Sequence, residues 1–144
     1  MYLSDEDFRH IYSKVPRFNI DLIIRSNEGI LFSLRAIEPY LGQWHIPGGT
    51  VYKDETMIEA AKRIAKRETG LDIEVTNEYL GFMEFYNEMR GEVEMHTISM
   101  VMEAKVIGGE LAPDNGAKKL EWLRSVPEHT VFQHGKFLQE KKLI

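Results

Sequence analysis

The sequence predicts an α/β (α+β) fold, in which strands come both before and after one central helix. Two observations support this class. Segments rich in β-branched and aromatic residues have the length of strands, and one long charged segment between them has the period of a helix. The chain has 144 residues without an internal repeat or linker, which predicts a single domain spanning 1–144. A doubly wound sheet is disfavoured because the strands do not alternate with helices.

The first helix is predicted to begin after Ser4, whose hydroxyl can cap it and is followed by acidic residues. It should end by residue 15, because the residue before Pro16 is biased away from helical geometry. A closing helix is predicted at 131–142.

The central helix is predicted from about Asp54 to Thr69. Either Asp54 or Thr56 can cap its first turn, and Thr56 with Glu59 fits a capping box. Gly70 follows at the position where helices commonly end in a left-handed residue.

The strands are separated by Gly- and Asn-containing turns, and Gly81 marks a bulge in the longest of them. A polar turn is predicted at 87–91, and loops at 36–44 and 108–117. The predicted strands are 18–25, 30–35, 72–86, 94–106 and 118–123.

Composition excludes several classes of protein. The net charge of −5 argues against sequence-independent binding to nucleic acid. Cysteine is absent, so disulfides and thiolate metal sites are excluded. No apolar run is long enough to span a membrane, and the first residues lack the pattern of a signal peptide, so we expect no membrane partner and a cytoplasmic location.

The candidate chemistry lies where a Pro-Gly-Gly loop leads into the central helix. Glycine lets the backbone approach a ligand closely and turn a carbonyl toward it. Mg²⁺ prefers oxygen ligands, often one or two carboxylates with carbonyls, waters and substrate phosphates. We therefore predict metal ligation by the Gly48 carbonyl and the Glu68 carboxylate.

The stretch from 48 to 71 resembles the Nudix box, G-x5-E-x7-R-E-U-x-E-E-x-G-U, in which U is aliphatic. The resemblance implies the Nudix-type α/β/α sandwich with a mixed β-sheet. It also implies Mg²⁺- or Mn²⁺-dependent hydrolysis of a nucleoside diphosphate linked to another moiety. The residues that match in register are Gly49, Glu55, Arg63, Glu68, Gly70 and Leu71.

Two glutamates of the box are replaced, by Ile64 and Arg67. Positions 64, 67 and 68 share one helix face, so a full box would gather three carboxylates there. With Glu68 alone, the site should hold fewer cations, and one is expected. Arg67 either supplies positive charge to the substrate or points to solvent. The resemblance implies that Arg63 braces the catalytic loop.

The pattern of losses is similar to the GDP-mannose mannosyl hydrolase branch of the family, which releases GDP and mannose by cleavage at the sugar carbon. The similarity includes the segments "MYLSDEDF", "IDLII" and "GQWHIPGGTVYKDET" and the later histidine, His96. It implies that Asp21 and Arg35 assist the departing diphosphate, and that the protein is a homodimer. A structural salt bridge of Asp21 is the alternative, because a bare buried charge is costly.

The branch carries a Gln-His pair in the loop before the last strand, and Gly116 and Ala117 stand in those places here. Asn115 or Asp114 could still offer an oxygen to the metal. The identity of the general base is therefore open. Tyr2 and Phe8 are candidate stacking residues for the substrate, and His45 is expected to line the loop. The candidate bases are His96, Glu84, Glu88, Glu92, His129 and His134.

Three functions fit these observations. The first is a Mg²⁺-dependent hydrolase of a nucleoside diphosphate sugar, with cleavage at the sugar carbon. The second is a conventional Nudix pyrophosphatase, which needs further carboxylates from outside the box, such as Glu84, Glu92 or Glu94. The third is a nucleotide-sugar-binding module with little catalysis.

Overall fold

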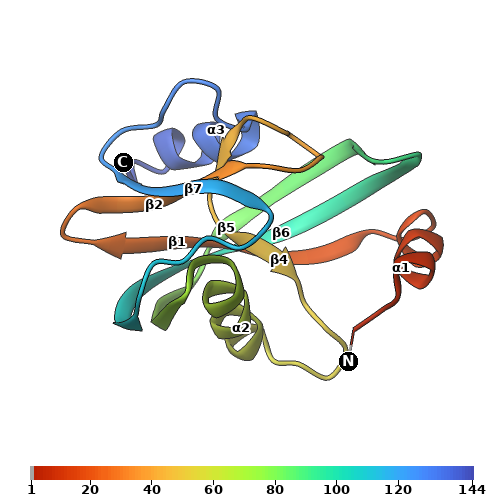
Figure 1. The fold of residues 1–144 in the computed structure, drawn as a ribbon, viewed down its shortest axis with the longest axis horizontal. Coiled ribbons are helices and arrows are strands. Elements are labelled where there is room, and N and C mark those ends of the chain that lie inside the picture. Colours follow the sequence, from red (N-terminus) through yellow and green to blue (C-terminus); the bar gives the residue numbers. More distant parts are fainter. Residues whose placement is uncertain (1) are drawn as a thin grey trace.

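The computed structural model describes residues 2–144 and contains one mixed sheet with a helix against each of its faces (Figure 1). This confirms the predicted fold class. The elements, in chain order, are α1 (Asp5–Tyr12), β1 (Arg17–Ser26), β2 (Gly29–Arg35), β3 (Trp44–His45), β4 (Gly48–Thr50), α2 (Met57–Thr69), β5 (Leu71–Arg90), β6 (Val93–Gly109), β7 (Ala117–Leu123) and α3 (Phe132–Glu140).

The order of strands along the sheet is β3-β2-β1-β6-β5, with β7 beside β2 and β4 beside β1. β1 and β6 run parallel, and the other paired strands are antiparallel. Along one edge, β1 exchanges its partner: residues 19–21 pair with β4, whereas residues 25–26 pair with β2. The chain of the Pro-Gly-Gly loop is therefore held directly against β1.

A hydrophobic core lies on each face of the sheet. Ile20, Leu22 and Ile24 face α2, and Ile23 faces α3, as the alternation of strand side chains requires. Because β1 is covered on both faces, it carries almost continuous apolar side chains from 20 to 24. Asp21 is the exception within this run, on the α3 side of the sheet.

The ends of α2 agree with the prediction. Thr56 is the N-cap and forms a reciprocal capping box with Glu59, while Gly70 ends the helix in the left-handed conformation at φ 79°. Asp54 does not cap the helix; it lies in the preceding turn with φ 66°.

The β5–β6 hairpin extends further than predicted, because residues 87–90 are strand and not turn. Glu88 pairs with Met95 and Arg90 pairs with Val93 across the hairpin, and the register shifts between Phe85 and Glu88. A second shift precedes Gly81, as predicted for a bulge. The polar residues near the tip thus belong to paired strands.

Other differences are small. α1 ends at Tyr12, within the predicted limit of residue 15, and the chain after it tightens, with the Lys14 amide donating to the Ile11 carbonyl. The predicted loop at 36–44 ends one residue early, because Trp44 begins the short strand β3. The short strand β4 was not predicted, and α3 is shorter than 131–142. None of the helices described in residues 2–144 has the length and apolar character needed to cross a bilayer.

Candidate active site

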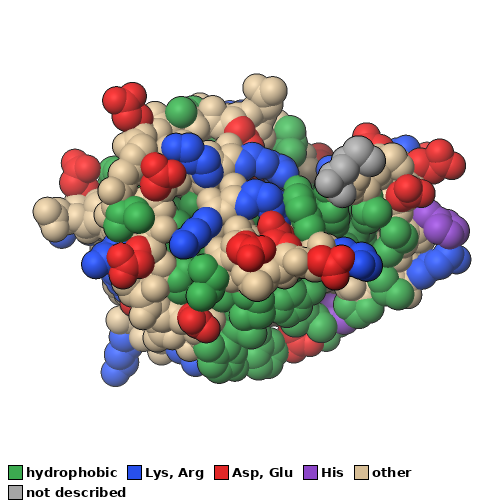
Figure 2. Space-filling view, turned by 90° about the horizontal axis from the view of Figure 1, so that it is seen from below, with side chains coloured by type: hydrophobic (Ala, Val, Ile, Leu, Met, Phe, Trp, Pro, Cys, Tyr) green, Lys and Arg blue, Asp and Glu red, His purple; other side chains and the backbone are tan. Residues whose placement is uncertain are grey.

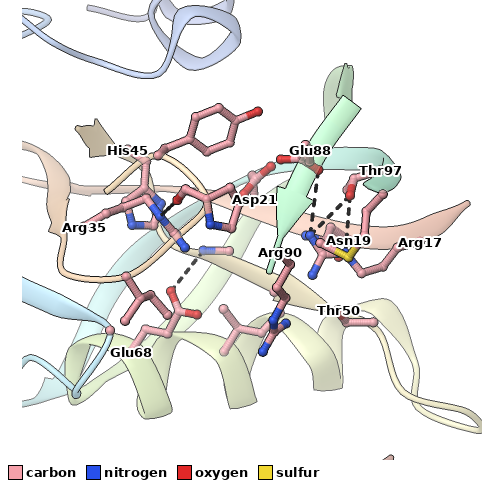
Figure 3. A pocket seen from close by; sticks show the side chains of 18 of the residues that line it. Arg17, Asn19, Asp21, Arg35, His45, Thr50, Glu68, Glu88, Arg90 and Thr97 are labelled. Carbon is pink, nitrogen blue, oxygen red and sulfur yellow. Dashed lines mark hydrogen bonds and ion pairs between the residues drawn. The ribbon is translucent and has the colours of Figure 1, made fainter. Parts of the chain in front are cut away.

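A cavity of about 290 Å³ lies between the Pro-Gly-Gly loop, the end of α2, β1, the β5–β6 hairpin and the N-terminal segment (Figure 3). Polar side chains gather in it although the molecule is acidic overall. The arginines that line it are Arg17, Arg35, Arg63, Arg67 and Arg90. On the side of the molecule seen in Figure 2, basic side chains cluster next to acidic ones near the middle.

Glu68 and Gly48 are brought together, as predicted. The Gly48 amide donates a hydrogen bond of 3.2 Å to Oε1 of Glu68. Burial raises the pKa of Glu68 to about 7, against the effect of this hydrogen bond, and the charges of Asp114 and Asp21 add to the rise. A nearby cation would therefore stabilise the ionised form of this carboxylate.

Ile64 occupies the place of a box glutamate and is 1% exposed. It belongs to the core cluster on the α2 side, and a Cβ added to Gly49 would lie 3.2 Å from its side chain. The last turns of α2 therefore present the carboxylate of Glu68 to the cavity, next to the apolar side chain of Ile64.

The loop before β7 contributes Asp114, not Asn115. Asp114 lines the cavity, and its Oδ1 accepts a hydrogen bond of 2.9 Å from the Gly116 amide. Asn115 is exposed and does not line the cavity.

The donor set fits a hard divalent cation. Glu68 and Asp114 are close enough that the charge of one raises the pKa of the other, and a cation between them would relieve this repulsion. Mg²⁺ commonly uses one or two carboxylates and keeps several waters. Within residues 2–144, no three acidic or histidine side chains are gathered as a complete ligand cage.

Asp21 lies opposite Gly48 in the pairing of β1 with β4 and is 6% exposed. The Ser99 hydroxyl donates a hydrogen bond to its Oδ2, and His134 Nε2 is 3.9 Å from the same oxygen. Burial raises the pKa of Asp21 to about 7, which the bond from Ser99 opposes. No arginine in residues 2–144 forms an ion pair with Asp21, and its neighbour of basic type is His134.

His134, from α3, is held as a neutral ring. Its Nδ1 accepts a hydrogen bond of 3.1 Å from the Ile46 amide, which places the proton on Nε2, toward Asp21. Burial, with the charge of Arg35, lowers the pKa of His134 to about 3. His45 is also buried, and burial likewise holds its pKa well below the usual value.

Arg35 reaches the cavity from the end of β2 and donates from Nε to the Pro39 carbonyl. Burial lowers its pKa, while the charges of Glu68, Glu88 and Asp21 act in the opposite direction. In Figure 3 its guanidinium lies between Asp21 and Glu68. It is thus close to both groups expected to act on the substrate.

Arg63 fastens α2 to the loop that precedes it. Its Nε is 2.7 Å from Oε2 of Glu55, and its Nη2 donates to the Thr50 carbonyl at 2.8 Å. Its guanidinium also lies 3.6 Å from the centre of the Tyr52 ring. This is a bracing contact, consistent with the expected role. Arg67, one turn later, is exposed and donates only a weak 3.3 Å bond to Tyr52.

The N-terminal segment covers one side of the cavity. Tyr2 stacks on Tyr52 with ring centres 3.9 Å apart, and its hydroxyl bonds with that of Tyr12. Phe8 is 7% exposed, and the guanidiniums of Arg17 and Arg90 lie over its ring. Both predicted stacking residues line the cavity, but Phe8 has little free ring surface.

His96 is not brought to this cavity. It lies on β6 between Met95 and Thr97, which face the cavity, so its own side chain points to the opposite face of the sheet. There it stacks on Tyr86 at 4.5 Å and lines a separate, smaller hollow. Alternation along the strand therefore excludes contact between His96 and a substrate in the main cavity.

Of the remaining candidate bases, Glu88 and His134 line the cavity, whereas Glu84, Glu92 and His129 do not. Sequence reasoning did not single out Arg17 or Asn19, which also line it. A signal was available: 17, 19 and 21 are polar and alternate with apolar residues, as expected for a strand with one face turned to a polar site.

Comparisons with known proteins identify the family. The model of the NUDIX domain matches residues 15–143. An ADP-ribose pyrophosphatase of Methanocaldococcus jannaschii is 35% identical over 127 residues, which are 87% of this chain and 72% of that protein. The low-salt glycan biosynthesis protein Agl8 of Haloferax volcanii is 31% identical over 121 residues, 83% of this chain and 78% of that protein.

Solved structures show the same fold. A MutT protein from Methanosarcina mazei superposes with a TM-score of 0.75 at 20% identity, covering 90% of this chain and 96% of that one. A MutT Nudix hydrolase from Burkholderia pseudomallei gives 0.75 at 22% identity, covering 88% and 98%. With the box residues gathered as described, the sequence and structural matches agree: the chain belongs to the Nudix family and is a hydrolase.

Proposed function

We propose that this hydrolase cleaves a nucleoside diphosphate sugar at the sugar carbon, releasing the nucleoside diphosphate, with GDP-mannose as the favoured substrate. The observation that supports this most directly is the end of α2, where a single box carboxylate faces a cavity rich in arginine. Cleavage at carbon leaves a diphosphate as the departing group. One cation with neighbouring guanidiniums can neutralise that charge, whereas attack at phosphorus commonly uses two metals.

Glu68 and Asp114, with the backbone at Gly48, are the groups that would hold Mg²⁺ or Mn²⁺. When bound, the cation would neutralise negative charge on the diphosphate. Arg35 and Arg67 line the same cavity as Glu68 and can donate hydrogen bonds to the phosphates. These side chains orient the leaving group.

We assign to Asp21 the removal of a proton from the water that attacks the sugar carbon, while the bond from that carbon to the diphosphate oxygen breaks and the nucleoside diphosphate leaves. The Asp21 pKa of about 7 suits a group that gains and loses a proton at neutral pH. The Ser99 hydroxyl donates to the Asp21 carboxylate, and Nε2 of the neutral His134 lies 3.9 Å from the same oxygen. His134 is not the base, because Nδ1, the ring nitrogen without a proton, already accepts a hydrogen bond from the Ile46 amide.

The test is the position of an oxygen label. The protein is incubated with Mg²⁺ and GDP-mannose in water enriched in ¹⁸O, and the products are analysed by mass spectrometry. Label in free mannose, with unlabelled GDP, is the expected result. Label in GMP or mannose 1-phosphate would establish attack at phosphorus and refute the proposal.

A conventional pyrophosphatase is the second candidate, favoured by one observation. Besides Glu68, the carboxylates that line the cavity are Asp5, Asp21, Glu38, Glu88 and Asp114, and not the Glu84, Glu92 or Glu94 expected from the sequence. The 35% identical relative is an ADP-ribose pyrophosphatase, so ADP-ribose belongs in the same labelling assay. Tight binding of a nucleotide sugar without any turnover would instead identify a binding module.

A homodimer is part of this proposal. Phe18, Phe82 and Tyr86 are 39%, 56% and 58% exposed, and the pairing of β1, β6 and β5 puts them on one face of the sheet. A second copy is the occupant that we propose for this face. Figure 2 shows hydrophobic side chains gathered beside the charged ones on the visible side.

A further inference from the structure

The cavity has two ends with different chemistry. At one end, Gly48, Glu68 and Asp114 surround the proposed cation and diphosphate position. At the other end, farther along β1 toward its start, lie Asn19 and Glu88, together with Arg17 (Figure 3).

One oxygen of the buried Glu88 carboxylate lacks a hydrogen-bond partner within residues 2–144, although the Tyr40 hydroxyl lies near this carboxylate. Glu88 is 6% exposed, and its Oε1 has no hydrogen-bond donor among the described residues. Arg17 is its nearest cation, at 4.0 Å, which is too long for a hydrogen bond. Arg17 instead directs Nε and Nη2 to the Thr97 hydroxyl, at 3.3 and 3.2 Å. The oxygen therefore remains an unused acceptor beside the cavity.

Asn19 offers a second unused acceptor. Its Oδ1 is buried and has no hydrogen-bond partner in residues 2–144. Asn19 and Asp21 are two residues apart on β1, so both face the cavity, about 7 Å apart along the strand. Leaving two acceptors unpaired is costly, unless a ligand brings donors to them.

The geometry points to a sugar subsite: we propose that Glu88 and Asn19 accept hydrogen bonds from hydroxyl groups of the substrate's sugar. This deepens the proposed function and rests on it. A sugar joined directly to a diphosphate at Gly48 and Glu68 would extend past Asp21 toward these acceptors. They come from different strands, β1 and β5, which suits hydroxyls that point in several directions from a ring.

A nucleobase fits this end less well. The donors of a base lie in one plane along one edge, and a base also requires an aromatic face on which to stack. Of the aromatic rings near this end, Phe8 is 7% exposed and lies beneath the guanidiniums of Arg17 and Arg90, so its faces are not free for a base. Tyr40 also lines the cavity and lies near Glu88 through its hydroxyl.

The experiment measures binding without turnover, by calorimetry in EDTA. GDP-mannose is compared with GDP, UDP-glucose with UDP, and ADP-ribose with ADP. For the nucleotide sugar that binds, Glu88→Gln should weaken affinity roughly ten- to hundredfold, while affinity for the matching diphosphate changes less than about twofold. Asn19→Leu, of similar size, should show the same selectivity for the sugar-bearing ligand.

Glu84→Gln is the matched control, since Glu84 is exposed on the same strand and bonds to Tyr86 outside the cavity. This variant should change neither the affinity for the nucleotide sugar nor the affinity for the matching diphosphate. Equal losses for the sugar and its diphosphate would overturn the inference, as would unchanged binding in folded Glu88 and Asn19 variants, or a wild-type protein that binds none of the nucleotide sugars. Because the readout is binding, it is independent of the labelling result: attack at phosphorus would refute the proposed reaction without altering a sugar-selective loss.

Discussion

We expect the metal-dependent rate to depend strongly on one residue, Glu68. Glu68→Gln should lower the Mg²⁺-dependent rate by at least about a hundredfold, because even groups that only support metal ligands are worth roughly 10- to 100-fold. Steady-state kinetics at several Mg²⁺ concentrations provides the measurement. Glu59→Gln is the control, since glutamine preserves the capping box of the same helix. A normal rate in the Glu68 variant would disprove its assignment as a ligand.

Asp21 should make stability depend on pH in an unusual direction. Its folded pKa of about 7 exceeds its ordinary value of 3.8, so the folded state keeps a proton that the unfolded chain has released. As pH rises from 3.8 to about 7, the burial of Asp21 progressively lowers the free energy of unfolding. Above about pH 7 this destabilisation is complete and no longer changes with pH. Asp21→Asn removes this destabilisation. In EDTA at pH 8 the variant should be more stable by roughly 2–4 kcal/mol.

Thermal unfolding from pH 5 to pH 8 tests this expectation. His45 and His134 have lowered pKa values in the folded protein, so their contribution is lost as pH falls through the window below about 6.5. Both proteins contain these histidines, and their contributions cancel in the difference between variant and wild type. A difference in stability that does not grow with pH would show that Asp21 is not buried as a carboxylic acid.

Individual residues were predictable where the motif fixes their position. Glu68, Gly48 and Arg63 follow from the spacing of the box along one helix and its preceding loop. His96 was misplaced because one sequence does not reveal which face of a strand is turned to the site. Asn115 was chosen over Asp114 because the direction of a side chain in a turn depends on backbone angles that composition does not determine.

At the scale of elements, the contact between β1 and β4 holds the loop of the box in place. A Cβ on Gly48 would lie 1.9 Å from Oδ1 of Asp21. Gly48→Ala should therefore separate the strands, at a cost of about 1–3 kcal/mol, with a loss of activity. Thermal unfolding and kinetics measure both effects. Gly108→Ala is the control, because its nearest neighbour would be at 3.4 Å, and equal behaviour of the two variants would contradict the argument.

The helix α2 depends on Arg63 for its position against that loop. Arg63→Lys keeps the charge but loses the fork that reaches Glu55 and the Thr50 carbonyl together. We expect kcat/KM to fall about tenfold or more, because small misplacements of catalytic groups are costly. Lys62→Arg on the exposed side of the same helix should have no effect. Similar kinetics for both variants would mean that Arg63 does not brace the site.

Elements with local signals were predicted well, whereas those stabilised by distant pairing were not. The caps of α2 are local: Thr56, Glu59 and Gly70 lie within the helix or next to it. The short strands β3 and β4 exist only because β2 and β1 lie beside them. Residues 87–90 resemble a turn in composition, yet pairing with β6 keeps 88–90 in the strand, while Asn87 lies at the register shift with φ 57°.

At the scale of the whole molecule, the exposed apolar face predicts self-association. Light scattering after size-exclusion chromatography should give twice the mass of 16.7 kDa. Phe82→Asp should shift the protein toward the monomer, since it places a charge on this face. Phe132→Ser is the control, because Phe132 is 74% exposed at the start of α3, on the other side of the sheet. A monomeric wild-type protein would refute the dimer.

The burial of Ile64 also limits how this active site could be re-engineered. Its side chain is packed among apolar neighbours near Gly49, so a glutamate of the full box would replace a piece of the core. An isolated Ile64→Glu change would place a carboxylate in an apolar site and destabilise the fold. A second metal site at this position would therefore require the surrounding core to be redesigned with it.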